Sequence, residues 1–162
     1  MHFEDNALPF MDKGFPDAWK AATIFAAAIA EETTRRGLTP AESELIKVRV
    51  SQLNGCVFCL DLHSRQARKL GVPQQKLDLL PAWREADLFS DREKALLAVG
   101  ETATELPLNE NSKADLIAAR YALGDEVFLS AEWVAASINL FNRISSLSDH
   151  PVRVRDPEAS ES

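Results

Sequence analysis

The sequence predicts an all-α protein, with a single domain of six to seven helices over residues 15–148. Long segments carry apolar residues at intervals of three and four, which is the spacing of one helix face. Glycine is scarce, with 6 in 162 residues, whereas alanine and leucine, which favour helices, are common. Two of the segments open with capping boxes, a signal of helix starts. An N-terminal arm, residues 1–14, and a flexible C-terminal tail, residues 149–162, are expected to flank the helical domain.

The first two helices are predicted at residues 16–37 and 39–55. Apolar residues recur through the first helix, and Gly37 follows it as a stop signal. The second opens with Thr39 and Glu42, a capping box in which each side chain binds a backbone N–H group of the other residue. Its "IKVRV" stretch alternates as a strand would, but the cap that precedes it favours a helix.

Glycine and serine mark the boundaries in the rest of the chain. Asn54-Gly55 interrupts the helical pattern, Ser90 and Glu93 form the second capping box, and Gly124 separates the last two helices. The tail is polar and broken by proline, so we expect it to be mobile or to lie on a neighbouring subunit. The remaining helices are expected at residues 56–71, 90–106, 111–124 and 124–148, with a turn or a short helix at 72–83.

Length and composition argue against several classes of protein. A chain of this size buries roughly 68–70% of its unfolded surface and needs no disulfide bonds to hold a core. The net charge of -7 argues against nucleic acid or an anionic membrane as a partner. The N-terminus lacks the basic and then apolar order of a signal peptide, and the run "AATIFAAAIA" is too short to span a bilayer. We therefore expect a cytoplasmic protein, in which a CxxC pair is more often redox-active or metal-binding than a permanent disulfide.

The stretch "NGCVFCLDLHSR" contains both cysteines of the chain, Cys56 and Cys59, followed by His63. On a helix these three residues fall on one face, because three and four residues each make about one turn. His63 can then reach the Cys59 sulfur directly or through one water, take its proton and stabilise the thiolate. The unpaired N–H groups at the helix start favour an anion near Cys56 as well. Together these effects predict a cysteine pKa lowered from about 8.5 to roughly 3.5–7.5, so that one sulfur is a thiolate at neutral pH.

Two thiols one turn apart predict a redox cycle. A thiolate that attacks a peroxide O–O bond becomes a sulfenic acid, and the second thiol condenses with it to a disulfide before further oxidation. An outside reductant must then regenerate the pair. The helix dipole favours Cys56 as the attacking thiol, whereas His63 favours Cys59, so the residues alone leave the assignment open.

Three other interpretations of this motif compete with the redox pair. A structural zinc site normally takes four Cys or His ligands, but the chain has no second CxxC, and His2 and His150 lie in the predicted arm and tail. We therefore expect no bound metal. The cysteines could also be buried as small apolar residues. A thioredoxin-like site is disfavoured, because its CxxC follows a strand in a βαβ unit.

An acidic partner for His63 is expected on the preceding helix. Glu42 is already used in the capping box, whereas Glu44 is free and precedes an apolar run. If the two helices pack as neighbours, Glu44 can approach His63. The alternative is that Glu44 is a solvated surface residue, and the residues alone favour it.

The segment "ESELIKVRVSQLNGCVFCLDLHSRQARKLG" resembles the AhpD-like alkylhydroperoxidases of the carboxymuconolactone decarboxylase superfamily. Their motif is a glutamate, about eleven residues, CxxC, three residues and a histidine, which Glu44, Cys56, Cys59 and His63 match. The resemblance extends over residues 15–148, through "LFSDREKALLAVGETAT" and "VAASINLFNRIS".

This resemblance implies an AhpD-like helical fold that assembles into a homo-trimer or homo-hexamer. It implies reduction of organic hydroperoxides without a bound cofactor, with electrons from an external dithiol, in the best-known members a dihydrolipoyl group. By the same resemblance, Cys59 attacks, Cys56 resolves, His63 is the base and Glu44 supports it. The chain departs from the prototype at Phe58, where the prototype has a histidine, so one member of its proton relay is absent here.

Two alternative functions remain open at this stage. The same scaffold could carry a carboxymuconolactone decarboxylase-like lactone or proton-transfer enzyme, which would need no redox cysteines. The motif could also belong to a non-enzymatic zinc or redox-sensing module. The intact CxxC favours the peroxidase over both.

Overall fold

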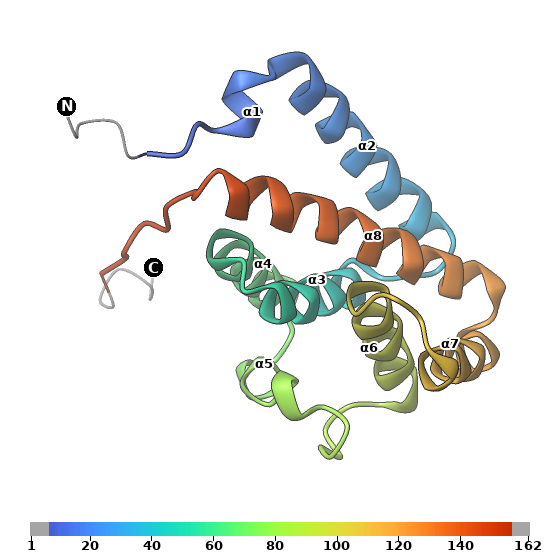
Figure 1. Ribbon diagram of the computed structural model, residues 1–162. Coiled ribbons are helices and arrows are strands. Elements are labelled where there is room, and N and C mark those ends of the chain that lie inside the picture. Colours follow the sequence, from blue (N-terminus) through green and yellow to red (C-terminus); the bar gives the residue numbers. More distant parts are fainter. Residues whose placement is uncertain (1–6, 157–162) are drawn as a thin grey trace.

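The computed structural model describes residues 7–156, and over that range the chain is all-helical, without a strand, as predicted (Figure 1). Six long helices match the six long helices expected from the sequence. Two short helices and one 3₁₀ turn complete the fold. The elements are α1 (Met11–Gly14), α2 (Pro16–Arg35), α3 (Pro40–Asn54), α4 (Val57–Lys69), α5 (Gln74–Asp78), the 3₁₀ turn η1 (Leu80–Ala82), α6 (Asp91–Thr104), α7 (Glu110–Leu123) and α8 (Asp125–Leu147).

Helix α8 runs through the middle of the molecule (Figure 1). It contacts α2 on one side and α3, α4, α6 and α7 on the other. Its sequence is apolar around most of its circumference, as a central helix requires. Because α8 contacts both α2 and the α3–α4 pair, it is the element that brings residues from the two ends of the chain together.

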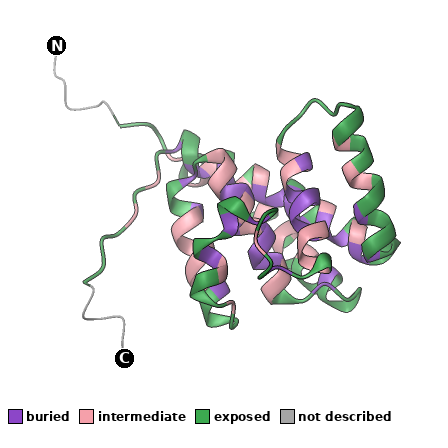
Figure 2. Cartoon of the chain, turned by 90° about the horizontal axis from the view of Figure 1, so that it is seen from below, coloured by how far each residue is buried: buried purple, intermediate pink, exposed green. Residues whose placement is uncertain are grey.

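The core consists of two clusters of buried side chains. The larger lies between α3, α6, α7 and α8, and the smaller lies between α3, α4, α6 and the α5–η1 segment. Figure 2 shows the buried residues concentrated in the middle of the bundle. Full burial of one such aliphatic side chain contributes about 1.5–3 kcal/mol. Fully buried members of the two clusters include Ile46, Val50, Leu96, Val99, Leu80 and Leu97.

Both predicted capping boxes are confirmed. Thr39 and Glu42 exchange hydrogen bonds at the start of α3, and Ser90 and Glu93 do so at the start of α6. A third box, which begins at Asn109, opens α7 and uses a serine rather than a glutamate as its second member. Each cap satisfies backbone N–H groups that the first helical turn leaves unpaired, an effect of about 1 kcal/mol.

Parts of the arm and the tail are ordered against the domain. The arm contains the short helix α1, which the sequence did not predict, and the N–H group of Met11 donates to the Ser148 Oγ (3.0 Å). Residues 149–156 form no helix or strand, and Arg155 forms an ion pair with Asp61 on α4 of the same chain. The rest of the predicted arm and tail, residues 1–6 and 157–162, lies outside the described residues.

Helix α2 packs along α8 and leaves most of its surface exposed. Thr33 is its one buried residue, and Ile24 is 63% exposed. Within residues 7–156, no helix combines the length and the hydrophobicity needed to cross a bilayer. The trimer or hexamer that the resemblance implies stays a prediction.

The contrast between core and surface isoleucines is testable. Ile46→Ala should lower the free energy of unfolding by about 2–5 kcal/mol, because Ile46 is fully buried and its loss leaves a cavity beside Gly100 on α6. Ile24→Ala, on the exposed face of α2, should change it by less than about 0.5 kcal/mol. Urea denaturation followed by circular dichroism measures both. Equal losses would contradict the core described here.

Candidate active site

The turn between α3 and α4 places both cysteines. Gly55 ends α3 with φ 62°, a left-handed conformation that glycine adopts at little cost. Cys56 follows as the N-cap of α4, and its sulfur accepts a hydrogen bond from the Cys59 N–H group (3.4 Å). The predicted break at Asn54-Gly55 and the helix that restarts after it are thus both present, with Cys56 at the helix boundary.

Both cysteines are reduced and buried. Cys56 is 1% exposed and Cys59 is 3% exposed. Cys59 borders a cavity of about 400 Å³ between α2, α3, α4 and α8, and its sulfur lies 3.8 Å from the Phe141 carbonyl oxygen. Cys56 does not reach the wall of this cavity. A small molecule in the cavity therefore meets Cys59 rather than Cys56. The cavity wall is largely apolar and includes Trp19, Ile29, Leu62, Val134, Ile138 and Phe141.

Glu44 and His63 meet at the edge of this cavity. The His63 Nδ1 lies 2.7 Å from one Glu44 carboxylate oxygen, and the Lys47 Nζ donates to the other at 3.2 Å. Burial raises the pKa of Glu44, but the hydrogen bond from His63 and the charge of Lys47 outweigh it and hold that pKa below its usual value. Glu44 is therefore a carboxylate at neutral pH and not a solvated surface residue. Lys47 was not anticipated, although its position one turn after Glu44 was visible in the sequence.

The contact with Glu44 fixes the tautomer of neutral His63. A carboxylate only accepts hydrogen bonds, so Nδ1 carries the proton and Nε2 keeps its lone pair. None of the residues from 7 to 156 hydrogen-bonds to Nε2, and His63 borders the same cavity as Cys59. His63 can therefore accept a proton inside the cavity, and Glu44 then stabilises the resulting imidazolium.

The predicted low pKa of the thiol is wrong for Cys59. Burial in the apolar cavity, reinforced by the adjacent Cys56, raises the pKa of Cys59 to about 11. The polar side chains of Asn142 and Ser145 lower the pKa of Cys59, but they are the weaker influences. The sequence prediction counted the effects of His63 and of the helix start, which lower a thiol pKa. It did not count the loss of water around the sulfur, which raises the pKa. At rest, Cys59 is a neutral thiol.

An amide network beneath the sulfur joins α3 to α8. Asn142 is 1% exposed, donates to the Ser51 Oγ (3.0 Å) and accepts from the Asn54 amide (2.9 Å). The Asn54 amide also donates to Asn139 (2.9 Å). Both α8 members of this network are asparagines. Their place, one turn apart on an otherwise apolar helix, was the signal for a buried polar contact.

The histidines outside the motif do not complete a metal site in the described part of the chain. His150 lies between Ser145 and Asp12, and His2 is outside the described residues. Among residues 7–156, no group of three or more His, Cys, Asp or Glu side chains is arranged to hold a metal ion.

Comparison with known proteins gives a consistent picture. Residues 16–102 match the sequence profile of the carboxymuconolactone decarboxylase family. The chain is 37% identical to the uncharacterized protein YdfG of Bacillus subtilis over 113 residues, which covers 70% of this chain and 77% of YdfG. It is 33% identical to the uncharacterized protein YnjA of Escherichia coli over 76 residues, 47% of this chain and 42% of YnjA.

A crystal structure gives a match over most of the fold. The protein ATU0492 of Agrobacterium tumefaciens, of unknown function and suggested to be the antioxidant defence protein AhpD, superposes with a TM-score of 0.75 at 28% identity. The match covers 89% of this chain and 96% of ATU0492. The helical fold predicted from the sequence is confirmed by this neighbour.

The raised pKa of Cys59 predicts its reaction with iodoacetamide. Below pH 9, the native thiol should react more slowly than the same thiol in the urea-unfolded chain, and it should reach half of its maximal rate only near pH 11. Since the folded state holds this proton more tightly, its stabilising effect is complete below the unfolded pKa and is lost as the pH rises through the folded one. Mass spectrometry of alkylated peptides measures the rates. A native rate that is already maximal at pH 7 would contradict the neutral resting thiol.

Proposed function

The chain belongs to the carboxymuconolactone decarboxylase family, and from that premise we propose that it is an AhpD-like thiol peroxidase that reduces organic hydroperoxides. One observation carries the proposal. The Glu44–His63 pair and the buried thiol of Cys59 border the same apolar cavity. A proton acceptor, its supporting carboxylate and a nucleophile are thus available to one small molecule.

In the first step, the Cys59 sulfur attacks an oxygen of the hydroperoxide. An S–O bond forms and the O–O bond breaks, so the peroxide is reduced to an alcohol and Cys59 is oxidised to a sulfenic acid. The thiol proton passes to the His63 Nε2, directly or through one water, and then to the departing alkoxide. Because the resting thiol has a raised pKa, proton transfer accompanies the attack, and no free thiolate is exposed beforehand.

In the second step, the Cys56 thiol attacks the sulfenic acid. The S–S bond forms, the S–O bond breaks, and the thiol proton leaves with the hydroxyl group as water. Cys56 is suited to this role because it is in hydrogen-bond contact with Cys59 yet lies behind the cavity wall. We infer that Cys59 attacks and Cys56 resolves.

The disulfide must then accept two electrons from outside. A dithiol attacks one sulfur, forms a mixed disulfide and leaves as its own cyclic disulfide, restoring both cysteines. We propose a dihydrolipoyl group, or a protein dithiol, as this reductant. The cavity of about 400 Å³ with its mainly apolar wall favours an organic hydroperoxide over hydrogen peroxide. Only the organic substrate has apolar surface of its own to bury against that wall.

A second candidate function uses the same carboxylate and histidine without the thiols. The Glu44–His63 pair with Lys47 is an acid–base group in its own right, as a lactone decarboxylase would need. Turnover of a lactone substrate that survives complete alkylation of both cysteines would favour this alternative. Stoichiometric zinc in protein purified without chelator would instead favour the metal-binding or redox-sensing module.

Cysteine variants test the peroxidase cycle. The reduced protein should consume about one equivalent of cumene hydroperoxide in the absence of reductant, as both thiols disappear. Cys59→Ser should abolish this reaction. Cys56→Ser should still consume about one equivalent but stop at a sulfenic acid that dimedone traps. Full activity of Cys59→Ser with dihydrolipoamide would exclude Cys59 as the attacking thiol.

Removing the charge of Glu44 tests the proton acceptor. Glu44→Gln should lower kcat/KM for the hydroperoxide by roughly 10- to 100-fold, because a neutral amide stabilises the imidazolium of His63 less well. Glu42→Gln is the matched control. Glu42 lies two positions before Glu44 on the same helix, but it pairs with Arg92 and does not border the cavity. Equal kinetics for the two variants would return Glu44 to a structural role.

A further inference from the structure

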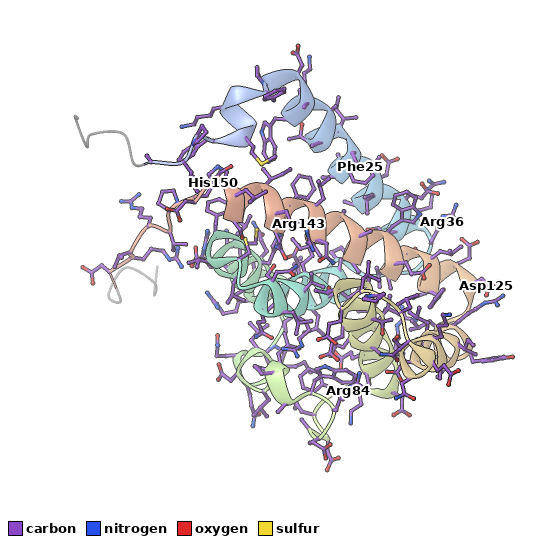
Figure 3. All side chains as sticks on the ribbon, viewed as in Figure 1. Phe25, Arg36, Arg84, Asp125, Arg143 and His150 are labelled. Carbon is purple, nitrogen blue, oxygen red and sulfur yellow. The ribbon has the colours of Figure 1, made fainter. Side chains whose placement is uncertain are left out.

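The outer face of α2 is apolar and exposed. Helix α2 contacts chiefly α8 and α1, and its residues 21–30, "AATIFAAAIA", carry no charge, yet none of them is buried in the described chain, residues 7–156. Figure 3 shows side chains on the outer edge of α2 that point away from α8. Contiguous exposed apolar surface of this kind is typical of a face that binds another protein.

Beside α2, the apolar surface continues onto α8. Leu129 is 46% exposed and Trp133 is 55% exposed, and the Trp133 ring packs edge-on against Phe25 of α2 with centroids 6.1 Å apart. These three side chains and Ala28 are among those that line a groove of about 330 Å³ between the two helices. The face therefore includes large apolar side chains as well as alanines.

The outermost residues of α2 follow the spacing of a coiled-coil seam. They recur at alternating intervals of four and three residues, so they lie on one side of the helix, and all of them are exposed. An isoleucine between two alanines forms the centre of this seam, and charged residues form its two ends. In chain order, the seam consists of Asp17, Ala21, Ile24, Ala28, Glu31 and Arg35.

The charges at the ends of the seam are unpaired within residues 7–156. The three charged side chains of the seam, and that of Lys20 beside it, form no ion pair or hydrogen bond there. Glu32, on another side of the same helix, is by contrast paired with Arg36. Along the helix the signs of the unpaired charges run negative, positive, negative and positive, at Asp17, Lys20, Glu31 and Arg35.

An antiparallel copy of the same helix complements this order of charges. When the midpoints of two such helices lie opposite each other, Lys20 of one copy is level with Glu31 of the other. The same alignment brings Asp17 to within about 1.5 Å of the level of Arg35, since each residue adds that length along the axis. In a parallel pair, each charge would instead lie beside its like.

The centre of the seam fits the same alignment. Ile24 of one copy comes opposite Ala28 of the other, so a large side chain meets a small one and the two helices can approach closely. Because the two copies are related by a two-fold axis, each of these contacts occurs twice. Shape and charge therefore favour the same partner, a second copy of this chain.

We propose that the outer face of α2 binds the same face of a second copy of this chain, antiparallel and about a two-fold axis. Such a contact occurs in a dimer and in a hexamer built from three pairs, but not in a cyclic trimer. The residues of α2 that line the cavity beside Cys59, such as Trp19, Thr23 and Ala30, lie on another side of the helix, and no residue of the seam borders that cavity. The pairing is therefore independent of the proposed peroxidase activity.

Charge reversal tests the pairing in the full chain, with the dissociation constant of the pair measured by sedimentation velocity over a wide range of protein concentration. Lys20→Glu and Glu31→Lys should each raise this constant by about tenfold, because like charges then face each other twice in every pair. The two substitutions combined should restore the parent value. Lys113→Glu on α7 is the matched control, since it alters the net charge as Lys20→Glu does at an equally exposed lysine outside the seam. It should leave the constant unchanged.

The variants are expected to fold normally, because the substituted side chains are exposed, and circular dichroism checks this. Pairing adds to the free energy of unfolding only at protein concentrations that sustain it. The small effect expected of Ile24→Ala on unfolding therefore applies to the dilute, dissociated chain.

Cross-linking tests the orientation of the two helices. In an equal mixture of ¹⁵N-labelled and unlabelled chains, a carbodiimide should join Lys20 of one isotope to Glu31 of the other, as mass spectrometry of the peptides would show. Within one chain these residues lie about 16 Å apart along the axis of α2, which is too far for a bond without a spacer. A link between the two isotopes therefore reports the antiparallel pair.

Four results would overturn the proposal. The first is a chain that stays monomeric at every concentration, which would assign the face to a different partner, and the second is a cyclic trimer. The others are single reversals with the dissociation constant of the parent and a combined variant that does not recover it. Because no readout uses a peroxide or a reductant, failure of the proposed peroxidase leaves this test intact.

Discussion

The rest of the site depends on the removal of the Cys59 sulfur from water. An isolated thiol in an apolar cavity keeps its proton, because the low dielectric environment stabilises a thiolate poorly. A buried thiol of this kind is protected from adventitious oxidation, but it cannot act as a nucleophile unless a nearby base accepts its proton. The buried carboxylate of Glu44 meets that need through His63, and its own charge is maintained by Lys47.

The fold meets this constraint with a small number of elements. The left-handed Gly55 turn sets α4 against α3, so that residues 19 positions apart come within hydrogen-bonding distance. Helix α8 supplies the opposite wall and the asparagine that links it to Ser51 and Asn54. A buried amide that hydrogen-bonds to two side chains is costly to rearrange, because each unmade hydrogen bond in such a place carries a desolvation penalty of about 1–3 kcal/mol. The network therefore fixes the distance between α8 and the thiols.

The sequence was sufficient for the helices and for the local half of the site. Periodicity and capping boxes predicted the six long helices, and the spacing of Cys56, Cys59 and His63 predicted that these side chains lie close together on one helix. Glu44 was placed beside them only by the resemblance to the family motif. It was insufficient wherever the property depends on distant parts of the chain. The raised pKa of Cys59 comes chiefly from its burial, beside a cavity whose wall includes residues of α2 and α8, and the Asn142–Ser51 bond spans 91 positions. His150 was expected in a tail that is mobile or lies on a neighbouring subunit. Its contact with Asp12 joins opposite ends of the chain and leaves no local pattern in the sequence.

The four walls of the cavity differ in how firmly they are held. Helices α3, α4 and α8 share buried clusters and the amide network, whereas α2 buries only Thr33 and rests chiefly on α8. Segments with little buried surface are the first to open in native-state fluctuations. Helix α2 is accordingly the wall that separates at the lowest free-energy cost. Displacement of α2 would open the cavity to an apolar molecule, while the helices that carry Cys59 and His63 keep their positions.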